Sequence, residues 1–210
     1  MSRLFAALVP SAAAVAHLRM ALAGWADPAA GRPTLRWIDP TQWHVTLAFY
    51  GEVPEGAVPE IEAALAAAVG RLTGPTLKIR GAGSFSGRTL WAGVAGATPD
   101  DTEVLGRLLS TSAAVGADVG VGDERRERRR AHLTLARAAS GPRDRPSAQL
   151  TAAVRALAVY EGPAWRPTGV QLVRSRLGAG RSGGPLHEVV AEPPFGEPDE
   201  SARAERRAGR

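Results

Sequence analysis

The sequence predicts an α+β fold built from two related halves. Apolar stretches with strand spacing and with helix spacing alternate along the 210 residues, and several predicted strands follow one another without an intervening helix. Such strand pairs argue against one purely parallel sheet. A five-residue pattern, His-x-Thr-Leu-Ala, also occurs once in each half, at His44 and at His132. We therefore expect each half to supply one strand that carries this pattern.

The elements of the first half are bounded by turn and capping residues. Pro10 ends the opening apolar run, and Ser11 can cap the helix that follows it. Asp39 and Pro40 form a turn before the first motif, and Gly70 closes a helix with Ala and Leu at helical spacing. We expect strands over residues 3–9, 34–38, 43–50, 76–80 and 89–94, and helices over residues 11–24 and 54–69.

The second half repeats these elements in a similar order. We expect helices over residues 102–115 and 147–158, and strands over residues 131–138, 170–176 and 187–191. The segment after residue 193 is rich in Pro, Glu and Arg and almost free of large apolar residues, which is typical of disorder. The sequence thus predicts one bilobal domain over residues 1–192 and a disordered tail over residues 193–210.

The composition excludes several kinds of site. The chain has no Cys, so it can form no disulfide, thiolate metal site or Cys nucleophile, and this fits the reducing cytosol. Neither a signal peptide nor the ~20 consecutive apolar residues of a membrane span is visible. We expect a soluble cytoplasmic protein without a membrane partner, and a monomer.

The net charge of +5 comes almost entirely from Arg, since Lys78 is the only Lys. The planar guanidinium matches phosphate geometry, so this bias suits a phosphate-bearing partner. A GC-rich genome produces the same bias whatever the function. The charged segment Asp123–Arg130 before the second motif is equally open to two interpretations, as a solvated loop or as a region that steers RNA.

The two motifs predict paired polar side chains on one face of each strand. Because side chains on a strand alternate, His44 and Thr46 share one face, and His132 and Thr134 share the equivalent face of the second strand. The aliphatic residues between them then point into the core. If the halves are related by pseudo-symmetry, the two His/Thr pairs face each other.

Such a pair of sites suits cleavage of a phosphodiester. One His can activate the attacking oxygen and the other can protonate the leaving oxygen, because the ordinary pKa of His allows both roles near neutral pH. The Thr hydroxyls can hold the non-bridging oxygens. A zinc site is the competing interpretation, but the sequence has no HExxH pattern and Thr is a poor ligand two residues after a His.

The chain resembles the 2H phosphoesterase superfamily, and within it the LigT-like RNA 2′,3′-cyclic phosphodiesterases, also called 2′-5′ RNA ligases. The resemblance runs from about Arg3 to Ala191. The segments that carry it are RLFAALVP, RWIDPTQWHVTLAFYGEVPE, LWAGV, AHLTLARA and VRSRLGAGRSGGPLHEVV. It implies a bilobal pseudo-symmetric fold in which two antiparallel sheets face a central cleft and the helices lie outside.

The resemblance also implies the chemistry. An RNA 2′,3′-cyclic phosphate end would be hydrolysed to a 2′-phosphomonoester without a metal or an organic cofactor, with His44 as the proton donor and His132 as the proton acceptor. Reversible formation of 2′-5′ linkages in RNA would be the same chemistry with a ribose hydroxyl in place of water. The residues themselves do not decide which His is acid and which is base.

Two further substrate-binding residues follow from the resemblance. Arg137 corresponds to an Arg that contacts phosphate, and Phe49 to a residue that can stack on a base. Each lies five residues after its His, which on a regular strand is the buried face, so a bulge would be needed to turn them toward the substrate. His187 stands where such proteins often have Tyr, either as a packed or surface residue or as a contributor to the site.

Two other functions remain open. The chain could be a non-catalytic RNA- or nucleotide-binding module of the same fold, although a binder does not require two imidazoles. It could also be a phosphodiesterase that acts on a different substrate, such as ADP-ribose cyclic phosphate or a 2′-5′ oligonucleotide.

Overall fold

The computed structural model describes residues 1–25, 35–121, 130–138, 148–180 and 183–197. The first half contains β1 (Ser2–Leu8), α1 (Ala12–Leu22), β2 (Leu35–Trp37), β3 (Val45–Val53), α2 (Val58–Val69) and β4 (Leu77–Phe85). The second half contains β5 (Thr89–Gly96), α3 (Pro99–Asp118), β6 (His132–Ala138), α4 (Ala148–Ala156), β7 (Gln171–Arg176) and β8 (Leu186–Ala191). The α+β class predicted from the sequence is confirmed.

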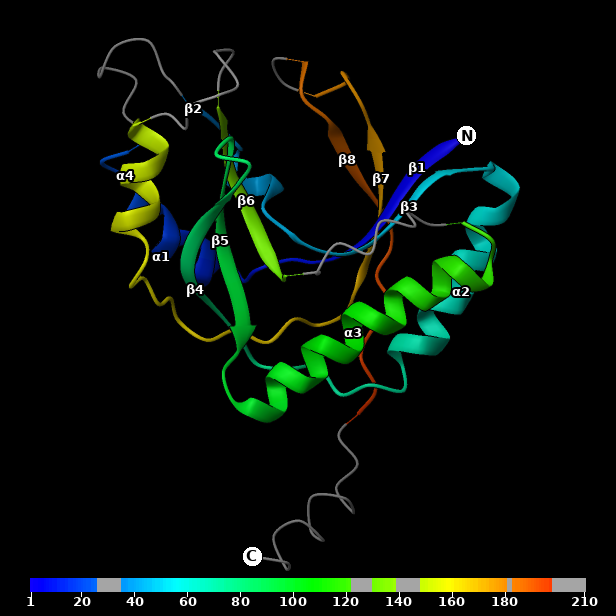
Figure 1. The fold of residues 1–210 in the computed structure, drawn as a ribbon. Helices are drawn as coiled ribbons and strands as arrows, with labels where there is room; N and C mark the ends of the chain where they lie inside the picture. Colours follow the sequence, from blue (N-terminus) through cyan, green and yellow to red (C-terminus); the bar gives the residue numbers. More distant parts are fainter. Residues whose placement is uncertain (26–34, 122–129, 139–147, 181–182, 198–210) are drawn as a thin grey trace, which may run out of the picture.

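All these strands belong to one antiparallel sheet of eight strands, in the order β4-β5-β6-β3-β1-β7-β8, with β2 paired to β6. The two arms of the sheet, β4-β5-β6 and β3-β1-β7-β8, meet where β3 pairs with β6 through Val45 and Leu133. Figure 1 shows the two arms diverging from this junction. The two sheets that the resemblance implies are therefore joined as arms of one sheet.

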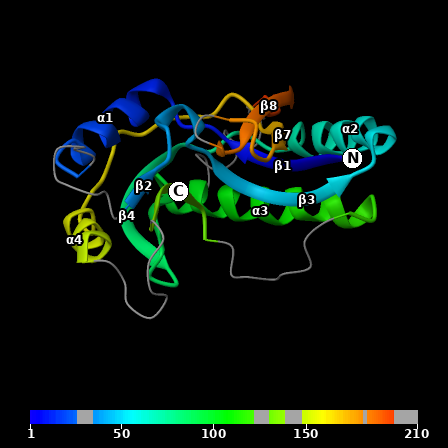
Figure 2. The same ribbon diagram turned by 90° about the horizontal axis from the view of Figure 1, so that it is seen from above.

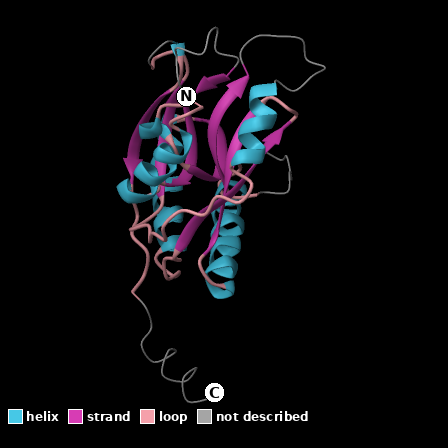
Figure 3. Ribbon diagram, turned by 90° about the vertical axis from the view of Figure 1, so that its left-hand side faces the viewer, coloured by secondary structure: helices cyan, strands magenta, loops and turns pink. Residues whose placement is uncertain are grey.

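Each arm is covered by helices on its outer side. Helices α2 and α3 lie beside β1 and β3, and α1 and α4 lie at the opposite end of the molecule, beside β2 and β4 (Figure 2). Figure 3 views the molecule from the side of α1 and α4. Helix α3 packs against the back of β3, where the hydroxyl of Tyr50 donates to the carbonyl of Ser112. The motif strands therefore have their opposite face free for a site.

Capping residues account for where the helices begin. Ser11 accepts a hydrogen bond from the amide of Ala14 and starts α1, as predicted. Helix α3 starts at Pro99, three residues earlier than predicted, because Thr98 and Asp101 form a reciprocal capping box. The strand predicted over residues 76–80 continues to Phe85 because it pairs with β5 on both sides of an irregularity between Ile79 and Ala82.

The last described residues correct the predicted tail boundary. Residues 193–197 are held by the body of the protein: the carbonyl of Pro193 accepts from the amide of Val170, and the amide of Gly196 donates to the carbonyl of Leu72. The ring of Phe195 also packs against the core. A short apolar anchor therefore follows the domain boundary predicted at residue 192, and the rest of the predicted tail lies outside the described residues. In the part of the chain that is described, no helix combines the length and apolar character needed to cross a membrane.

Candidate active site

The two motif histidines lie at equivalent places beside the junction of the arms. His44 immediately precedes β3 and His132 is the first residue of β6, and the residues that follow them, Val45 and Leu133, pair with each other. Both imidazoles are partly buried, as are the side chains of Thr46 and Thr134. Their aliphatic neighbours Val45, Leu47, Leu133 and Leu135 are buried in the core. The predicted alternation of the two motifs is confirmed.

Each motif strand then contains a bulge. The pairing of β3 with β1 skips Leu47, and the pairing of β6 with β5 skips Leu135. In both strands the skipped leucine and the alanine after it are buried. The extra residue shifts the alternation by one, so Phe49 and Arg137 return to the face that carries the motif threonines. Both side chains are exposed there, and Phe49 is 48% accessible.

Both imidazoles are held by the same hydrogen bond. Nδ1 of His44 lies 2.7 Å from the carbonyl oxygen of Gln42, and Nδ1 of His132 lies 2.7 Å from that of Arg130. A carbonyl oxygen can only accept, so each Nδ1 carries the proton. Each Nε2 is therefore the atom that can accept or deliver a proton during catalysis.

Aromatic rings pack beside each histidine. The ring centroid of Phe5 lies 4.9 Å from that of His44, and that of Phe85 lies 4.9 Å from that of His132. In the second half, the ring centroid of Trp91 also lies 6.3 Å from that of His132. The guanidinium of Arg130 in turn lies 5.3 Å from the centroid of the Trp91 ring. These rings limit the orientations of both imidazoles and exclude water from one side of each.

The environment of His44 favours its neutral form. Burial lowers the pKa of His44 to about 4, the hydrogen bond to the carbonyl of Gln42 opposes this shift, and the nearby His187 and His132 add to it. His132 thus lies close enough to His44 to influence its pKa. Without a bound substrate, His44 is therefore unprotonated at neutral pH.

His187 belongs to this site as well. Its ring centroid lies 5.2 Å from that of His44, at an interplanar angle of 78°, and 5.2 Å from that of Phe5. Burial holds the pKa of His187 below its usual value. Of the two interpretations of this residue, the structure supports a place at the edge of the site.

Phe5 and Arg36 are among the residues of the site that were not predicted from the sequence. Phe5 was assigned only to an apolar strand, although its ring contacts His44, His187 and Phe49. Arg36 of β2 pairs directly with Arg137 of β6, which places two exposed guanidinium side chains next to each other. Pairing between strands distant in the sequence creates both neighbours, so no local signal could have revealed them.

The charged segment before the second motif and the possibility of a metal site remain to be considered. Of the charged segment Asp123–Arg130, only Arg130 lies within the described residues. Among the residues that the structure does describe, no group of three His, Asp or Glu side chains is arranged to hold a metal ion.

Comparison with known proteins agrees with this geometry. Residues 13–95, which include the first motif, match the family model described as LigT like Phosphoesterase. A comparison with curated proteins gave no match.

Solved structures show the same fold over nearly the whole chain. TT0787 of Thermus thermophilus is 23% identical, with 93% of this chain and 100% of that chain covered and a TM-score of 0.66. E. coli LigT complexed with 3′-AMP is 24% identical, with 93% and 99% covered and a TM-score of 0.65. The MHV ns2 PDE domain is 12% identical, with 83% and 99% covered and a TM-score of 0.50. Residues 13–95 therefore match a LigT-like phosphoesterase family model, and the chain as a whole shares the fold of these solved structures.

Proposed function

We propose that the protein is a metal-independent phosphodiesterase that opens 2′,3′-cyclic phosphates at RNA ends and leaves a 2′-phosphomonoester. The observation that carries this proposal is the equivalence of the two His/Thr pairs. Each His follows a carbonyl that holds its Nδ1 proton, and the residues after the two histidines pair with each other. Two imidazoles that offer Nε2 in one site can supply an acid and a base to the same phosphorus.

The reaction we propose is in-line displacement by water. His132 Nε2 takes a proton from the water as its oxygen bonds to phosphorus, and the bond from phosphorus to O3′ breaks. His44 Nε2 gives a proton to O3′, so the product carries its phosphate on O2′. The hydroxyls of Thr46 and Thr134 donate to the non-bridging oxygens, and Arg137 neutralises their charge.

The low pKa of His44 sets a condition on this division of roles. A general acid must hold a proton, whereas His44 is neutral in the free protein. The negative charge of the bound phosphate favours the imidazolium form, so binding of the substrate must raise the pKa of His44. His44 then becomes an acid only when a phosphate is present.

A nucleotide ligand is the partner that fits these groups. E. coli LigT has been crystallised with 3′-AMP, with NADP+ and with ATP. In this chain the ring of Phe49 is exposed, and we propose that it stacks on a base while the motif residues hold the phosphate. The same site could form a 2′-5′ linkage, since a ribose hydroxyl in place of water can attack the phosphorus of the cyclic phosphate while O3′ leaves and takes a proton from His44.

The test is incubation with an RNA oligonucleotide that ends in a 2′,3′-cyclic phosphate, in the presence of EDTA. We expect complete conversion to the 2′-phosphate, resolved from the 3′-phosphate by chromatography. Cyclic ends that persist at high enzyme concentration would contradict hydrolysis and favour a binding module. Activity that disappears on chelation would instead indicate a metal mechanism. Parallel assays with ADP-ribose cyclic phosphate and a 2′-5′ oligonucleotide compare the alternative substrates.

A further inference from the structure

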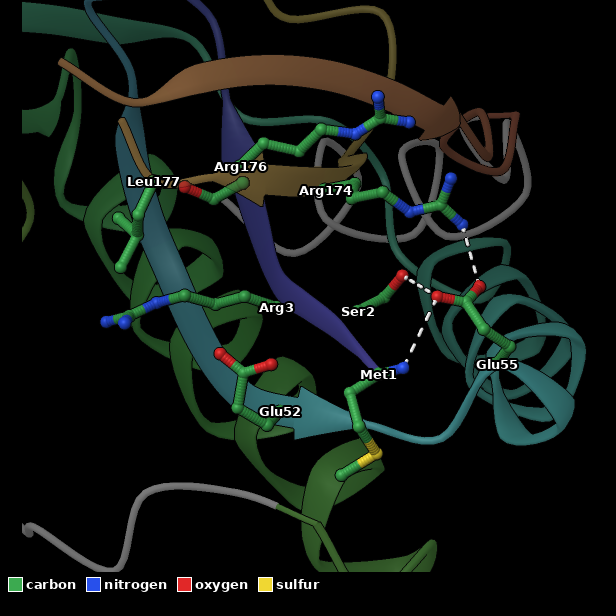
Figure 4. Close-up of a pocket in the computed structure, with 9 residues that line it drawn as sticks. Met1, Ser2, Arg3, Glu52, Glu55, Arg174, Arg176 and Leu177 are labelled. Carbon is green, nitrogen blue, oxygen red and sulfur yellow. Dashed lines mark hydrogen bonds and ion pairs between the residues drawn. The ribbon is translucent and has the colours of Figure 1, made fainter. Parts of the chain in front are cut away.

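A cavity of about 300 Å³ lies at the end of β1 and β7 that is remote from the junction of the arms. Its lining includes three guanidinium groups, from Arg3, Arg174 and Arg176, against two carboxylates, from Glu52 and Glu55. Figure 4 shows Arg3, Glu52 and Leu177 to one side of β1, and Ser2, Arg174 and Glu55 to the other. None of these residues has a role in the hydrolysis described above.

Strand pairing links this cavity to the catalytic face. On β1, Arg3 and Phe5 lie two residues apart and so share a face, and Phe5 contacts His44. On β7, Val173 pairs with Phe5, and Ser175 lies two residues further toward the cavity on the same face. Ser175 in turn pairs with His187. The part of the cavity lined by Arg3 and Ser175 therefore continues the face of the site beyond Phe5.

A second bulge in β3, at Tyr50, extends the catalytic face of this strand to the cavity. The pairing of β3 with β1 skips Tyr50, so Phe49 pairs with Phe5 and Glu52 pairs with Arg3. With the bulge at Leu47, this gives the catalytic face of β3 a side chain at every third residue: Thr46, Phe49 and Glu52. Along β3, the proposed phosphate-holding Thr46 is thus followed by the exposed ring of Phe49 and then by Glu52 at the edge of the cavity.

The three arginines of the cavity differ in whether they form ion pairs. Arg174 forms ion pairs with Glu55 at 3.3 Å and with Glu188 at 4.0 Å, and Arg176 pairs with Glu188 at 3.1 Å. The side chain of Arg3 is exposed and makes no ion pair with another described residue, although Glu52 is its cross-strand neighbour. Arg3 is therefore the guanidinium of the cavity that is available to an external anion.

We propose that Arg3 and the adjoining cavity bind the phosphodiester that joins the reacting terminal nucleotide to the nucleotide before it. The proposal rests on the function proposed above. When the cyclic phosphate lies at His44 and the terminal base lies on Phe49, the chain leaves the site toward Arg3. Two residues along a strand span roughly 7 Å, which is of the order of one nucleotide, and the Arg side chain adds further reach. A guanidinium at this point suits a phosphate oxygen.

The test compares a nucleoside 2′,3′-cyclic phosphate with a dinucleotide that ends in the same group, because only the dinucleotide has the second phosphate. The measured quantity is the ratio of kcat/KM for the dinucleotide to kcat/KM for the mononucleotide. We expect Arg3→Gln to lower this ratio about threefold to fivefold, as for an exposed ion pair. Glu52→Gln should raise the ratio because it removes the carboxylate beside Arg3. Arg107→Gln, an exposed substitution on α3, is the matched control and should leave the ratio unchanged.

A salt series gives an independent measure. For a single strand, each phosphate contact contributes about 0.7 to the slope of log affinity against log salt concentration, so Arg3→Gln should reduce the slope for the dinucleotide by about that amount. An unchanged ratio and slope in Arg3→Gln, or an equal loss on both substrates, would overturn the assignment of Arg3 while leaving the hydrolase proposal intact.

Direct binding separates the two proposals if the wild-type protein opens neither cyclic phosphate. In that case the affinities for a dinucleotide 2′-phosphate and a nucleoside 2′-phosphate are measured by titration calorimetry. A weaker affinity of Arg3→Gln for the dinucleotide alone would support the subsite although hydrolysis had failed. Equal affinities in wild type and variant, or no binding by either, would overturn it.

Discussion

Val45 of β3 pairs with Leu133 of β6, and each of these residues directly follows a motif histidine. Equivalent positions of the two halves therefore meet at the junction of the sheet, as expected at an approximate twofold axis. The carbonyl bonds of His44 and His132 and the bulges that follow them repeat on both sides of this pair. A substrate bound beside the junction would contact one His/Thr pair from each half.

This relationship predicts that neither histidine is dispensable. His44→Ala and His132→Ala should each lower kcat by about 10²–10⁴-fold, because each removes an acid or a base from the reaction. Thr46→Ala and Thr134→Ala should lose less, since each removes one hydrogen bond to the phosphate. Single-turnover assays measure these losses, and circular dichroism checks that the variants are folded. Near-normal turnover by either histidine variant would rule out the two-histidine mechanism.

Binding of a phosphate ligand should be coupled to uptake of a proton. The pKa of His44 is about 4 in the free protein and must rise when a negative charge lies beside it. Calorimetric titration with a nucleoside 2′-phosphate in buffers of different ionisation enthalpy, between pH 5 and pH 7, measures this uptake. His44→Gln is the control and should lose it. If wild type takes up no proton, His44 stays neutral in the complex and is better suited to be the base.

The same shift predicts how stability depends on pH. The pKa of His44 is near 6.5 when unfolded and about 4 when folded, so the unfolded chain binds the proton more readily. The free energy of unfolding should fall as the pH drops from about 6.5 to about 4, by roughly 3 kcal/mol from this residue. Urea denaturation of wild type and His44→Gln measures it. The difference between the two proteins should change across this range and stay constant above pH 7; a constant difference throughout would refute the burial argument.

Arg137 should contribute to phosphate binding because the bulge at Leu135 turns it to the catalytic face. Arg137→Gln should lower kcat/KM for a cyclic mononucleotide about 10–100-fold, since a hydrogen bond to a charged group is typically worth 1.5–3 kcal/mol. Steady-state kinetics check this, with Arg107→Gln as the control. A loss no larger than that of the control would mean that Arg137 points away from the phosphate.

Gly83 should be intolerant of any side chain. A Cβ at this position of β4 would overlap the indole ring of Trp91, which packs beside His132. Gly83→Ala should destabilise the protein by about 1–3 kcal/mol through overpacking, and should also reduce activity by displacing Trp91. Gly106→Ala is the control, because a Cβ there meets no other atom within 4 Å on the exposed side of α3. Equal unfolding midpoints for the two variants would show that the Trp91 ring can move aside.

Much of the candidate site was predictable because it depends on local patterns. The alternation of side chains along a strand is set by backbone geometry, so His44 and Thr46 could be assigned to one face, and Val45 and Leu47 to the core. Capping at Ser11 and the order of strands and helices are local in the same sense. Residues 193–197 show the limit of such reasoning. They depart from the predicted tail because the ring of Phe195 and the backbone hydrogen bonds of Pro193 and Gly196 hold them against elements distant in the sequence.

The sequence alone thus established the two His/Thr pairs, the faces on which they lie and the α+β class. Which strands pair, and where a pairing skips a residue, was decided only by tertiary structure, because a bulge forms to fit one strand to its partner and leaves no mark of its own in the sequence. Those bulges turn Phe49 and Arg137 to the face that carries the motif threonines and align Glu52 with Arg3. The pairing also places Phe5 and His187 beside His44, where burial lowers the pKa of that imidazole.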